Sequence, residues 1–206
     1  MARLPRLVAP HQPHFVSQRG HDGLAIFRDA EDFQVFLAFL REAARQFRVA
    51  IHAYVLLPEQ FQLLASPRDE TGLARMMQWI GRKYVPFFNG KYGRQGTRWQ
   101  GRYRATMLDA GSYLLLACRY LERQPVNAGL AATALDYPWS SAPHHAGVKP
   151  DSLNTDHPTY WALGNTPFDR EAAYRPLLEQ ELDPAQREAF AGAVSKGWPL
   201  GSPEYR

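Results

Sequence analysis

Two apolar segments separated by only two residues are the feature that most constrains the fold of this chain. Residues 49–57 (VAIHAYVLL) and 60–66 (QFQLLAS) have the length and side-chain content of β-strands. Pro58 and Glu59 between them leave room for a tight turn and nothing longer. The two segments are therefore predicted to pair as a hairpin.

Further elements surround this hairpin. Asp29 is a suitable N-cap for an amphipathic helix whose apolar residues recur at helical spacing. A later helix should stop before Pro125, because a residue that precedes proline is disfavoured in helical geometry. In chain order the expected elements are a strand (14–19), a helix (29–47), the hairpin, a helix (71–89), a strand (102–108) and a helix (111–123). This order predicts an α+β fold, an antiparallel sheet with helices packed on one face.

The C-terminal part of the chain has a different character. Residues 136–166 are rich in Pro, His and Gly and are expected to form an irregular connector. Helical periodicity resumes at 168–196, with a break near Asp183 and Pro184. Residues 151–206 hold five basic and nine acidic side chains, a net charge of −4. The predicted organisation is a domain at 1–148 followed by a connector and an acidic helical tail at 149–206.

Composition narrows the class of protein. A length of 206 residues with 45% hydrophobic side chains suits one soluble domain with appendages and excludes a wholly disordered chain. The single cysteine, Cys118, excludes an intrachain disulfide framework and a cysteine-rich zinc site. No apolar stretch approaches the roughly 20 residues of a membrane span, and the first residues do not read as a signal peptide. We therefore expect a cytoplasmic protein without a membrane partner, with Met1 starting the mature chain.

Positive charge is concentrated in the middle of the sequence. Residues 68–104 hold nine Lys or Arg against two acidic residues, a net charge of +7. The basic residues alternate with aromatic ones, a mixture that pairs phosphate contacts with base stacking on single-stranded nucleic acid. The alternative, a solvated helix face with its aromatic side chains in the core, is the better interpretation for Trp79 and Tyr84. For the Gly- and Arg-rich loop 94–104, nucleic-acid contact is favoured.

Three segments together resemble the REP-associated tyrosine transposases, a bacterial branch of the single-tyrosine transposases. They are residues 14–40 (an opening strand, an Arg-Gly turn and a first helix), 51–64 (a strand pair) and 99–141. The last segment contains QGRY, a tyrosine helix and the signature Tyr-Pro-Trp-Ser-Ser, and is the most specific. The resemblance covers roughly residues 11–148. It implies a ferredoxin-like sheet that binds and cuts single-stranded or hairpin DNA.

Tyr120 matches the family's nucleophilic tyrosine, and Gln124 matches the position of a third metal ligand. The two residues are four apart, so on a helix they lie on the same face. In such chemistry the tyrosine attacks phosphorus to give a phosphotyrosyl link, while a divalent ion neutralises developing charge. Without the resemblance, Tyr120 would be interpreted as a packing residue, because it continues an apolar helical stripe.

The second segment departs from the family at its metal-binding His-hydrophobic-His motif. Gln60 and Gln62 stand where the histidines are expected, on either side of Phe61. Period-two geometry still points both amides to one face of the sheet. With Gln124 they would offer three neutral oxygens, which Mg²⁺ or Ca²⁺ accepts more readily than transition metals do. The expected cofactor is a divalent cation, Mg²⁺ or Mn²⁺, that is held weakly or has been lost.

His52 and Glu59 are two neighbouring residues that could replace the expected histidines as metal ligands. His52 lies on the strand before Gln60, where a hydrogen-bonded structural histidine is the commoner role. Glu59 carries a carboxylate, but strand alternation points it away from the Gln60 face unless the turn twists it inward. A solvated turn residue is the simpler interpretation for Glu59.

The resulting interpretation is a transposase-like protein that binds single-stranded or hairpin DNA as a monomer or homodimer. It cleaves and rejoins DNA through Tyr120 if it is active. The alternative is a domesticated binding protein that recognises structured DNA without cutting it, and a basic scaffold without a DNA role is a third reading. The expected DNA-binding residues are Arg19, Arg82, Lys83, Arg94, Arg98, Trp99, Arg102 and Arg104.

Overall fold

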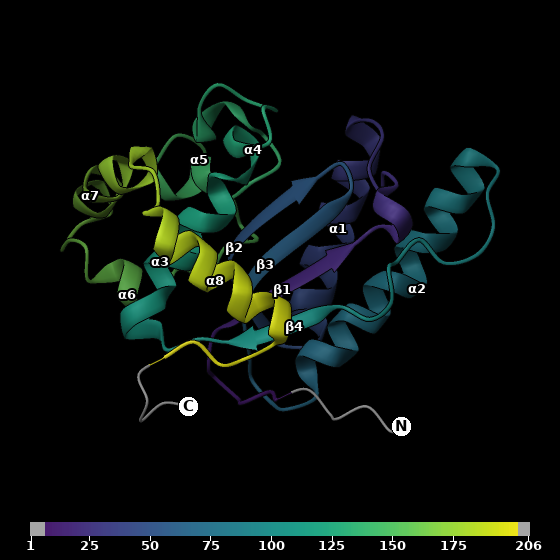
Figure 1. Ribbon diagram of the computed structural model, residues 1–206, viewed down its shortest axis with the longest axis horizontal. Coiled ribbons are helices and arrows are strands. Elements are labelled where there is room, and N and C mark those ends of the chain that lie inside the picture. Colours follow the sequence, from purple (N-terminus) through teal and green to yellow (C-terminus); the bar gives the residue numbers. More distant parts are fainter. Residues whose placement is uncertain (1–6, 202–206) are drawn as a thin grey trace.

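A four-stranded antiparallel sheet lies at the centre of the computed structural model, which describes residues 7–201 (Figure 1). Its strands are β1 His14–Arg19, β2 Val49–Leu57, β3 Gln60–Pro67 and β4 Arg104–Met107. They are ordered β2-β3-β1-β4, and every pairing is antiparallel. The predicted hairpin is confirmed, with Leu57 of β2 facing Gln60 of β3 across the turn. The predicted α+β fold with a ferredoxin-like sheet is confirmed as well.

Two long helices cover one face of this sheet. They are α1 Ala30–Gln46 and α2 Gly72–Tyr92, which precede and follow the hairpin in the sequence. A short turn of 3-10 helix, η1 His21–Gly23, lies between β1 and α1. Phe36 and Tyr84 are fully buried where the two helices meet Phe61 of the sheet. Asp29 caps α1 as predicted, because its side chain accepts a hydrogen bond of 3.1 Å from the Asp32 amide.

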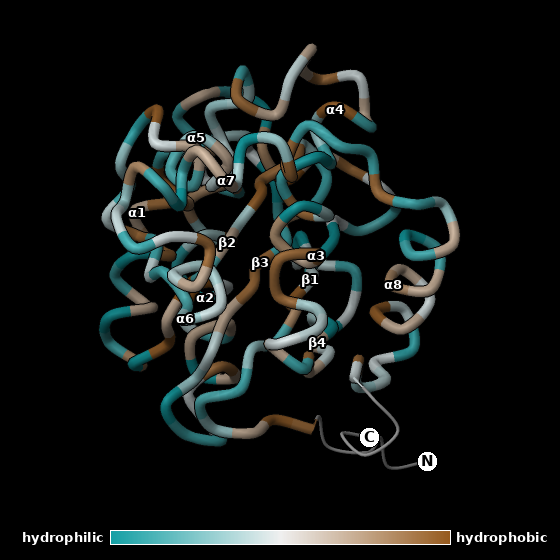
Figure 2. The backbone as a smooth tube through the Cα atoms, turned by 90° about the vertical axis from the view of Figure 1, so that its left-hand side faces the viewer, coloured by the Kyte–Doolittle hydropathy of each residue, from teal (hydrophilic) through white to brown (hydrophobic). Residues whose placement is uncertain are grey.

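The third helix, α3 Ala110–Glu122, lies on the opposite face, which corrects the prediction that all helices share one face. Leu114 and Leu121 of α3 are buried there in one cluster with Phe15 and Leu64 of the sheet. The reason is visible in β2 and β3, whose side chains are buried on both sides of the strand. A sheet with two apolar faces needs a cover on each of them. These apolar strands run through the middle of the molecule (brown in Figure 2).

The C-terminal half adds short and medium helices around α3, and the predicted helical extension is confirmed. They are α4 Gln124–Asn127, a 3-10 turn η2 Ala134–Asp136, α5 Ala142–His145, α6 Pro158–Trp161, α7 Pro167–Glu179 and α8 Pro184–Lys196. The connector is thus less irregular than expected, since α5 and α6 fall within it. Tyr174 of α7 and Phe190 of α8 are buried in the same cluster as α3.

The boundary at residue 148 stays a prediction, and the segments 1–6 and 202–206 lie outside the described residues. Within residues 7–201, every helix is too short or too polar to cross a membrane.

The Tyr-Pro-Trp-Ser-Ser signature fastens the connector to β2. The Tyr137 hydroxyl donates a 2.7 Å hydrogen bond to the Leu56 carbonyl, and the Leu56 amide donates one of 2.9 Å to the Trp139 carbonyl. Ser141 accepts a further hydrogen bond of 3.0 Å from the Tyr54 amide. The signature therefore acts as an extra edge contact for the sheet, and no hydrolase chemistry needs to be assigned to its serines.

Candidate nucleic-acid interface

Strand register brings polar side chains from three strands onto the sheet face that carries α3. Gln62 of β3 faces Ser17 of β1, which in turn faces Arg104 of β4. Gln60 of β3 faces Arg19 of β1 in the neighbouring row. Directly paired residues project to the same side of a sheet, so these side chains lie together beyond the apolar row that α3 covers. The sheet thus changes along its length from a core face to a polar face.

A cleft of about 390 Å³ opens over this polar face. We call it the tyrosine cleft, and its lining residues include Arg19, Gln60, Gln62, Arg102, Arg104 and Tyr120. Five elements distant in sequence therefore meet in one place: β1, β3, the segment that leads into β4, α3 and α8. No Asp or Glu is among the described residues that line it. Its fixed charges are all positive.

Tyr120 borders the cleft from the last turns of α3. Its ring packs edge-on against Phe15, with 5.8 Å between ring centroids, and against Phe190 of α8 at 4.7 Å. The side chain is half-buried, so the ring is held by packing while the residue still lines the cleft. Packing and access to a ligand are therefore compatible at this position. A nucleophilic role for Tyr120 stays a prediction.

Gln124 is not brought into the cleft with the other two glutamines. α3 ends at Glu122, and Gln124 begins the short helix α4, whose first turn contains Pro125. The cleft is lined by Gln60 and Gln62, and Gln124 is not among its lining residues. The expected three-amide set is therefore reduced to two amides at the site itself.

The amide of Gln60 is already engaged. Arg19 donates a hydrogen bond of 3.0 Å from Nε to Gln60 Oε1, and the Gln62 side-chain amide donates one of 3.4 Å to the same oxygen. Both glutamines are buried, at 5% and 6% exposure. Gln62 Oε1 is also buried and has no hydrogen-bond partner within residues 7–201. Of the two amide oxygens at the predicted metal position, one already accepts a hydrogen bond from an arginine.

This donor set does not fit a divalent cation. A metal ion at Gln60 Oε1 would meet the positive guanidinium of Arg19, which is hydrogen-bonded to that same oxygen. Gln62 Oε1 offers a single neutral donor, whereas Mg²⁺ and Ca²⁺ sites in proteins rely on carboxylates. Residues 7–201 contain no group of three or more His, Cys, Asp or Glu side chains that could hold a metal.

The two alternative ligands are committed elsewhere. His52 donates from Nδ1 to the Thr155 carbonyl at 2.7 Å, and Nε2 accepts from the Ser66 hydroxyl at 2.9 Å. Burial lowers the pKa of His52 to about 4, consistent with a neutral ring that uses both nitrogens. Glu59 is half-buried in the hairpin turn and does not line the cleft. His52 is a structural histidine, as the simpler sequence interpretation held.

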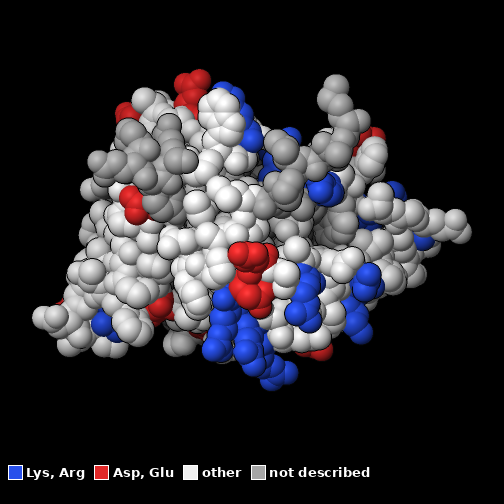
Figure 3. Space-filling view, turned by 90° about the horizontal axis from the view of Figure 1, so that it is seen from below, with Lys and Arg blue, Asp and Glu red and all other residues white. Residues whose placement is uncertain are grey.

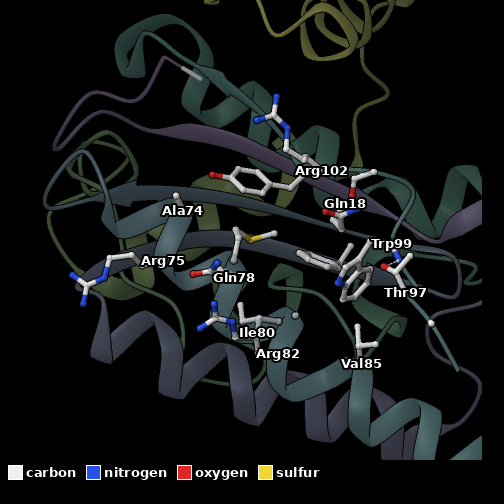
Figure 4. Close-up of a pocket in the computed structure, with 16 residues that line it drawn as sticks. Gln18, Ala74, Arg75, Gln78, Ile80, Arg82, Val85, Thr97, Trp99 and Arg102 are labelled. Atoms are coloured by element: carbon white, nitrogen blue, oxygen red, sulfur yellow. Dashed lines mark hydrogen bonds between the residues drawn. The ribbon is translucent and has the colours of Figure 1, made fainter. Parts of the chain in front are cut away.

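A second cavity, of about 650 Å³, lies between α2 and residues 96–103 (Figure 4). We call it the α2 groove. Arg75 and Arg82 extend from α2, Arg102 lies on the opposite side, and Trp99 forms part of its wall. Gly81 allows the close approach of this wall, since a Cβ there would lie 3.2 Å from the Trp99 indole nitrogen. Arg102 lines both the α2 groove and the tyrosine cleft, so the two cavities meet at this residue.

The other predicted DNA-binding residues differ in their surroundings. Arg82, Lys83 and Arg94 are exposed. Arg98 is only 8% exposed and lies over the Phe88 ring at 5.6 Å, so it is part of the packing of its loop. Trp99 is half-buried and stacks on Tyr84 with 6.2 Å between centroids. In Figure 3 the Lys and Arg side chains on the face shown gather mainly toward the α2 end of the molecule.

Sequence reasoning missed two contributions to the tyrosine cleft. The position of Ser17 could have been predicted from the sequence, because residues two apart on a strand share a face and Ser17 lies between Phe15 and Arg19 at that spacing. The contribution of α8 could not, because it depends on tertiary docking: α8 lies beside α3 (Figure 1), and its Ser195 carbonyl accepts a 2.9 Å hydrogen bond from Arg104. The C-terminal helix is thus part of the cleft wall.

Comparison with known proteins gives a structural match. No protein-family model matches the sequence, and no curated protein matches it. The structure of a REP-associated tyrosine transposase bound to a REP hairpin matches with a TM-score of 0.58 and 16% identity, over 77% of this chain and 93% of that chain. A candidate transposase from Deinococcus radiodurans R1 matches at a TM-score of 0.39 and 15% identity, over 60% of this chain and 98% of that chain. The resemblance predicted from the sequence is confirmed at the level of architecture: this protein has the fold of a REP-associated tyrosine transposase.

Proposed function

We propose that this protein binds hairpin or single-stranded DNA along the tyrosine cleft and the α2 groove. The observation that carries the proposal is Arg102, which lines both cavities and so joins them into one basic surface. Arginines line both cavities and no acidic residue among the described ones does. This charge pattern suits a phosphate backbone. The REP hairpin bound to the structural neighbour supports the choice of a hairpin as ligand.

The aromatic content of the α2 groove supports a single-stranded element in that ligand. Phe61, Trp99 and Tyr103 line the groove beside Arg75 and Arg82. An unpaired base can stack against aromatic side chains while the arginines contact the flanking phosphates. Fully paired DNA offers no free base face to such a groove. A hairpin with an unpaired tip or end is therefore the preferred ligand over a plain duplex.

Binding is tested by fluorescence anisotropy with a labelled DNA hairpin, titrated at several salt concentrations. We expect affinity to fall as salt rises, and we expect Arg102→Ala to weaken binding and to reduce the slope of log affinity against log salt by about one. Arg45→Ala is the matched control, because Arg45 is an exposed arginine on α1 that lines neither the tyrosine cleft nor the α2 groove. Failure to bind any hairpin or single strand at low salt would exclude the proposed function.

A second candidate function, strand cleavage by Tyr120, is favoured by one observation: the residue lines the cleft together with Arg104 and Gln62. In this reaction the tyrosine hydroxyl loses its proton to solvent and its oxygen forms a bond to phosphorus, while the bond to the leaving sugar oxygen breaks and that oxygen takes up a proton from solvent. A labelled hairpin would then remain attached to the protein on a denaturing gel. The adduct should be absent with Tyr120→Phe. Binding without any adduct would leave the protein as a structured-DNA-binding protein.

A further inference from the structure

A guanidinium group is hydrogen-bonded to one of the two glutamines that stand where the family resemblance predicts metal-ligating histidines. Arg19 and Gln60 are directly opposed residues of β1 and β3, and Arg19 Nε donates to Gln60 Oε1 at 3.0 Å. An arginine side chain stays charged at any physiological pH, so this contact places a permanent positive charge beside the two glutamines. The protein itself therefore supplies this charge, without a bound ion.

The backbone around Arg19 is held from both sides. The Arg19 carbonyl accepts a hydrogen bond of 2.9 Å from the Gln100 amide, and the Gly20 amide donates one of 2.7 Å to the Glu59 carbonyl. Gly20 has no room for a side chain, since a Cβ would collide with the Leu24 carbonyl oxygen. The Arg-Gly turn therefore sets the place from which the Arg19 side chain enters the cleft.

The Arg19 side chain keeps most of its hydrogen-bonding capacity for a ligand. A guanidinium has five N–H donors, and within residues 7–201 the Arg19 side chain donates to Gln60 only. The bond through Nε leaves the two terminal amino groups, which form the edge that matches two oxygens of a phosphate. Arg102 and Arg104 line the same cleft and add to the positive potential. The arrangement fits an anion far better than a cation.

We propose that the tyrosine cleft binds a DNA phosphate without a divalent cation, with the Arg19 guanidinium supplying the positive charge and Gln60 orienting it. The proposal rests on the DNA-binding function above. Arg19 is assigned as a phosphate-binding residue, and Gln60 as the residue that positions it. The buried Gln62 holds Gln60 in place through its side-chain amide. Arg19, at the end of strand β1, thus supplies the positive charge that a metal would otherwise bring.

Hairpin binding in the presence of EDTA and in Mg²⁺ or Mn²⁺ at matched ionic strength is the first test. We expect affinities that agree within about twofold, because no metal takes part in binding. Arg19→Ala should weaken hairpin binding by about tenfold under both conditions, the value of one charged hydrogen-bonding contact. Arg19→Lys should retain the charge and recover part of the loss, since an ammonium cannot orient on Gln60 while offering a two-pronged edge.

Arg45→Ala again serves as the matched control and should bind as the unmodified protein does. Thermal unfolding of each variant checks folding, and Arg19 is exposed, so little change is expected there. A direct test of metal binding uses Mn²⁺ alone, followed by electron paramagnetic resonance, and no binding up to about 1 mM is expected, a concentration that still reveals weak sites.

The outcomes separate the two proposals. Absence of hairpin binding under every condition removes the DNA-binding function itself. Hairpin binding that EDTA weakens strongly, that is indifferent to Arg19→Ala, or that comes with Mn²⁺ binding abolished by Gln62→Leu would overturn the metal-free phosphate site and leave DNA binding standing.

Discussion

Arg19 of β1 and Gln60 of β3 form a cross-strand pair in which a guanidinium nitrogen donates to an amide oxygen at 3.0 Å. The pair fixes the sign of the charge at the centre of the tyrosine cleft. The resemblance to single-tyrosine transposases implies metal-ligating histidines at positions 60 and 62. Here a neutral glutamine and a charged arginine are hydrogen-bonded to each other, so this part of the cleft carries a positive charge.

Gln60→Glu should weaken hairpin binding by about tenfold or more. The carboxylate would pair with Arg19 and add a negative charge where a phosphate is expected. Gln60→Leu should cost less, about threefold, because it removes the orienting hydrogen bond without adding charge. Anisotropy with a labelled hairpin in EDTA measures both. Equal losses for the two variants would contradict an electrostatic role for this position.

Tyr120→Phe should leave the free energy of unfolding within about 0.5 kcal/mol of the original, because the ring that packs on Phe15 and Phe190 is retained. Phe190→Ala should destabilise the protein by about 3 to 5 kcal/mol, since this ring is only 1% exposed. Urea denaturation measures both changes. A stable Tyr120→Phe variant makes any loss of DNA adduct a loss of chemistry, whereas strong destabilisation would assign the hydroxyl a structural role.

Glu122 anchors the C-terminal helices to α3 through a buried network. Its carboxylate accepts hydrogen bonds from Ser141 at 2.5 Å, His145 at 2.6 Å and Tyr174 at 2.7 Å. Glu122→Ala should cost about 3 to 5 kcal/mol of stability, because three buried donors lose their acceptor and His145 loses its counter-charge. The control Glu42→Ala, at an exposed site on α1, should change stability by less than about 0.5 kcal/mol. Chemical denaturation distinguishes the two, and similar small effects would show that the network is dispensable.

His52 predicts a pH dependence of stability. Burial lowers its pKa in the folded protein to about 4, below the value near 6.5 of the unfolded chain. The unfolded state therefore binds the proton more readily between these values. The contribution of His52 to stability is fully present above pH 6.5 and is lost as pH falls toward 4, by about 3 kcal/mol in all.

The test compares variants, because other histidines titrate in the same range. Burial alone would lower the pKa of His145, but the adjacent Glu122 carboxylate raises it, so His145 acts in the opposite direction. Burial also lowers the pKa values of His14 and His157, so these two residues act in the same direction as His52. His52→Gln should therefore reduce the acid-side slope between pH 6.5 and 4 without abolishing it, measured by urea denaturation at each pH. His21→Gln, at an exposed site, should leave the slope unchanged. An unaltered slope in His52→Gln would assign the acid sensitivity to other groups.

Local sequence alone was enough to predict much of the secondary structure of this protein. The two-residue link between β2 and β3 and the cap at Asp29 are decided by backbone geometry within a few residues. α3 ends at Glu122, before Pro125 as predicted, but Gln124 is itself helical in α4, so the preference against a helical residue before proline does not explain this end. Strand alternation also placed Gln60 and Gln62 on one face, and both line the tyrosine cleft. Such features follow from turn length, capping and periodicity, which need no partner from elsewhere in the chain.

Only the tertiary structure determines which residues pack against each of these strand and helix faces. Arg19 and Gln60 are separated by 41 positions, and their contact depends on the register between β1 and β3. The split of α3 from α1 and α2 onto opposite faces, and the seating of Phe190 against Tyr120, depend on how apolar surfaces are shared out when the chain collapses. Periodicity states that a face is apolar or polar, but several helices could cover the same face. The choice among them, and with it the charge in the cleft, belongs to the packing of the whole chain.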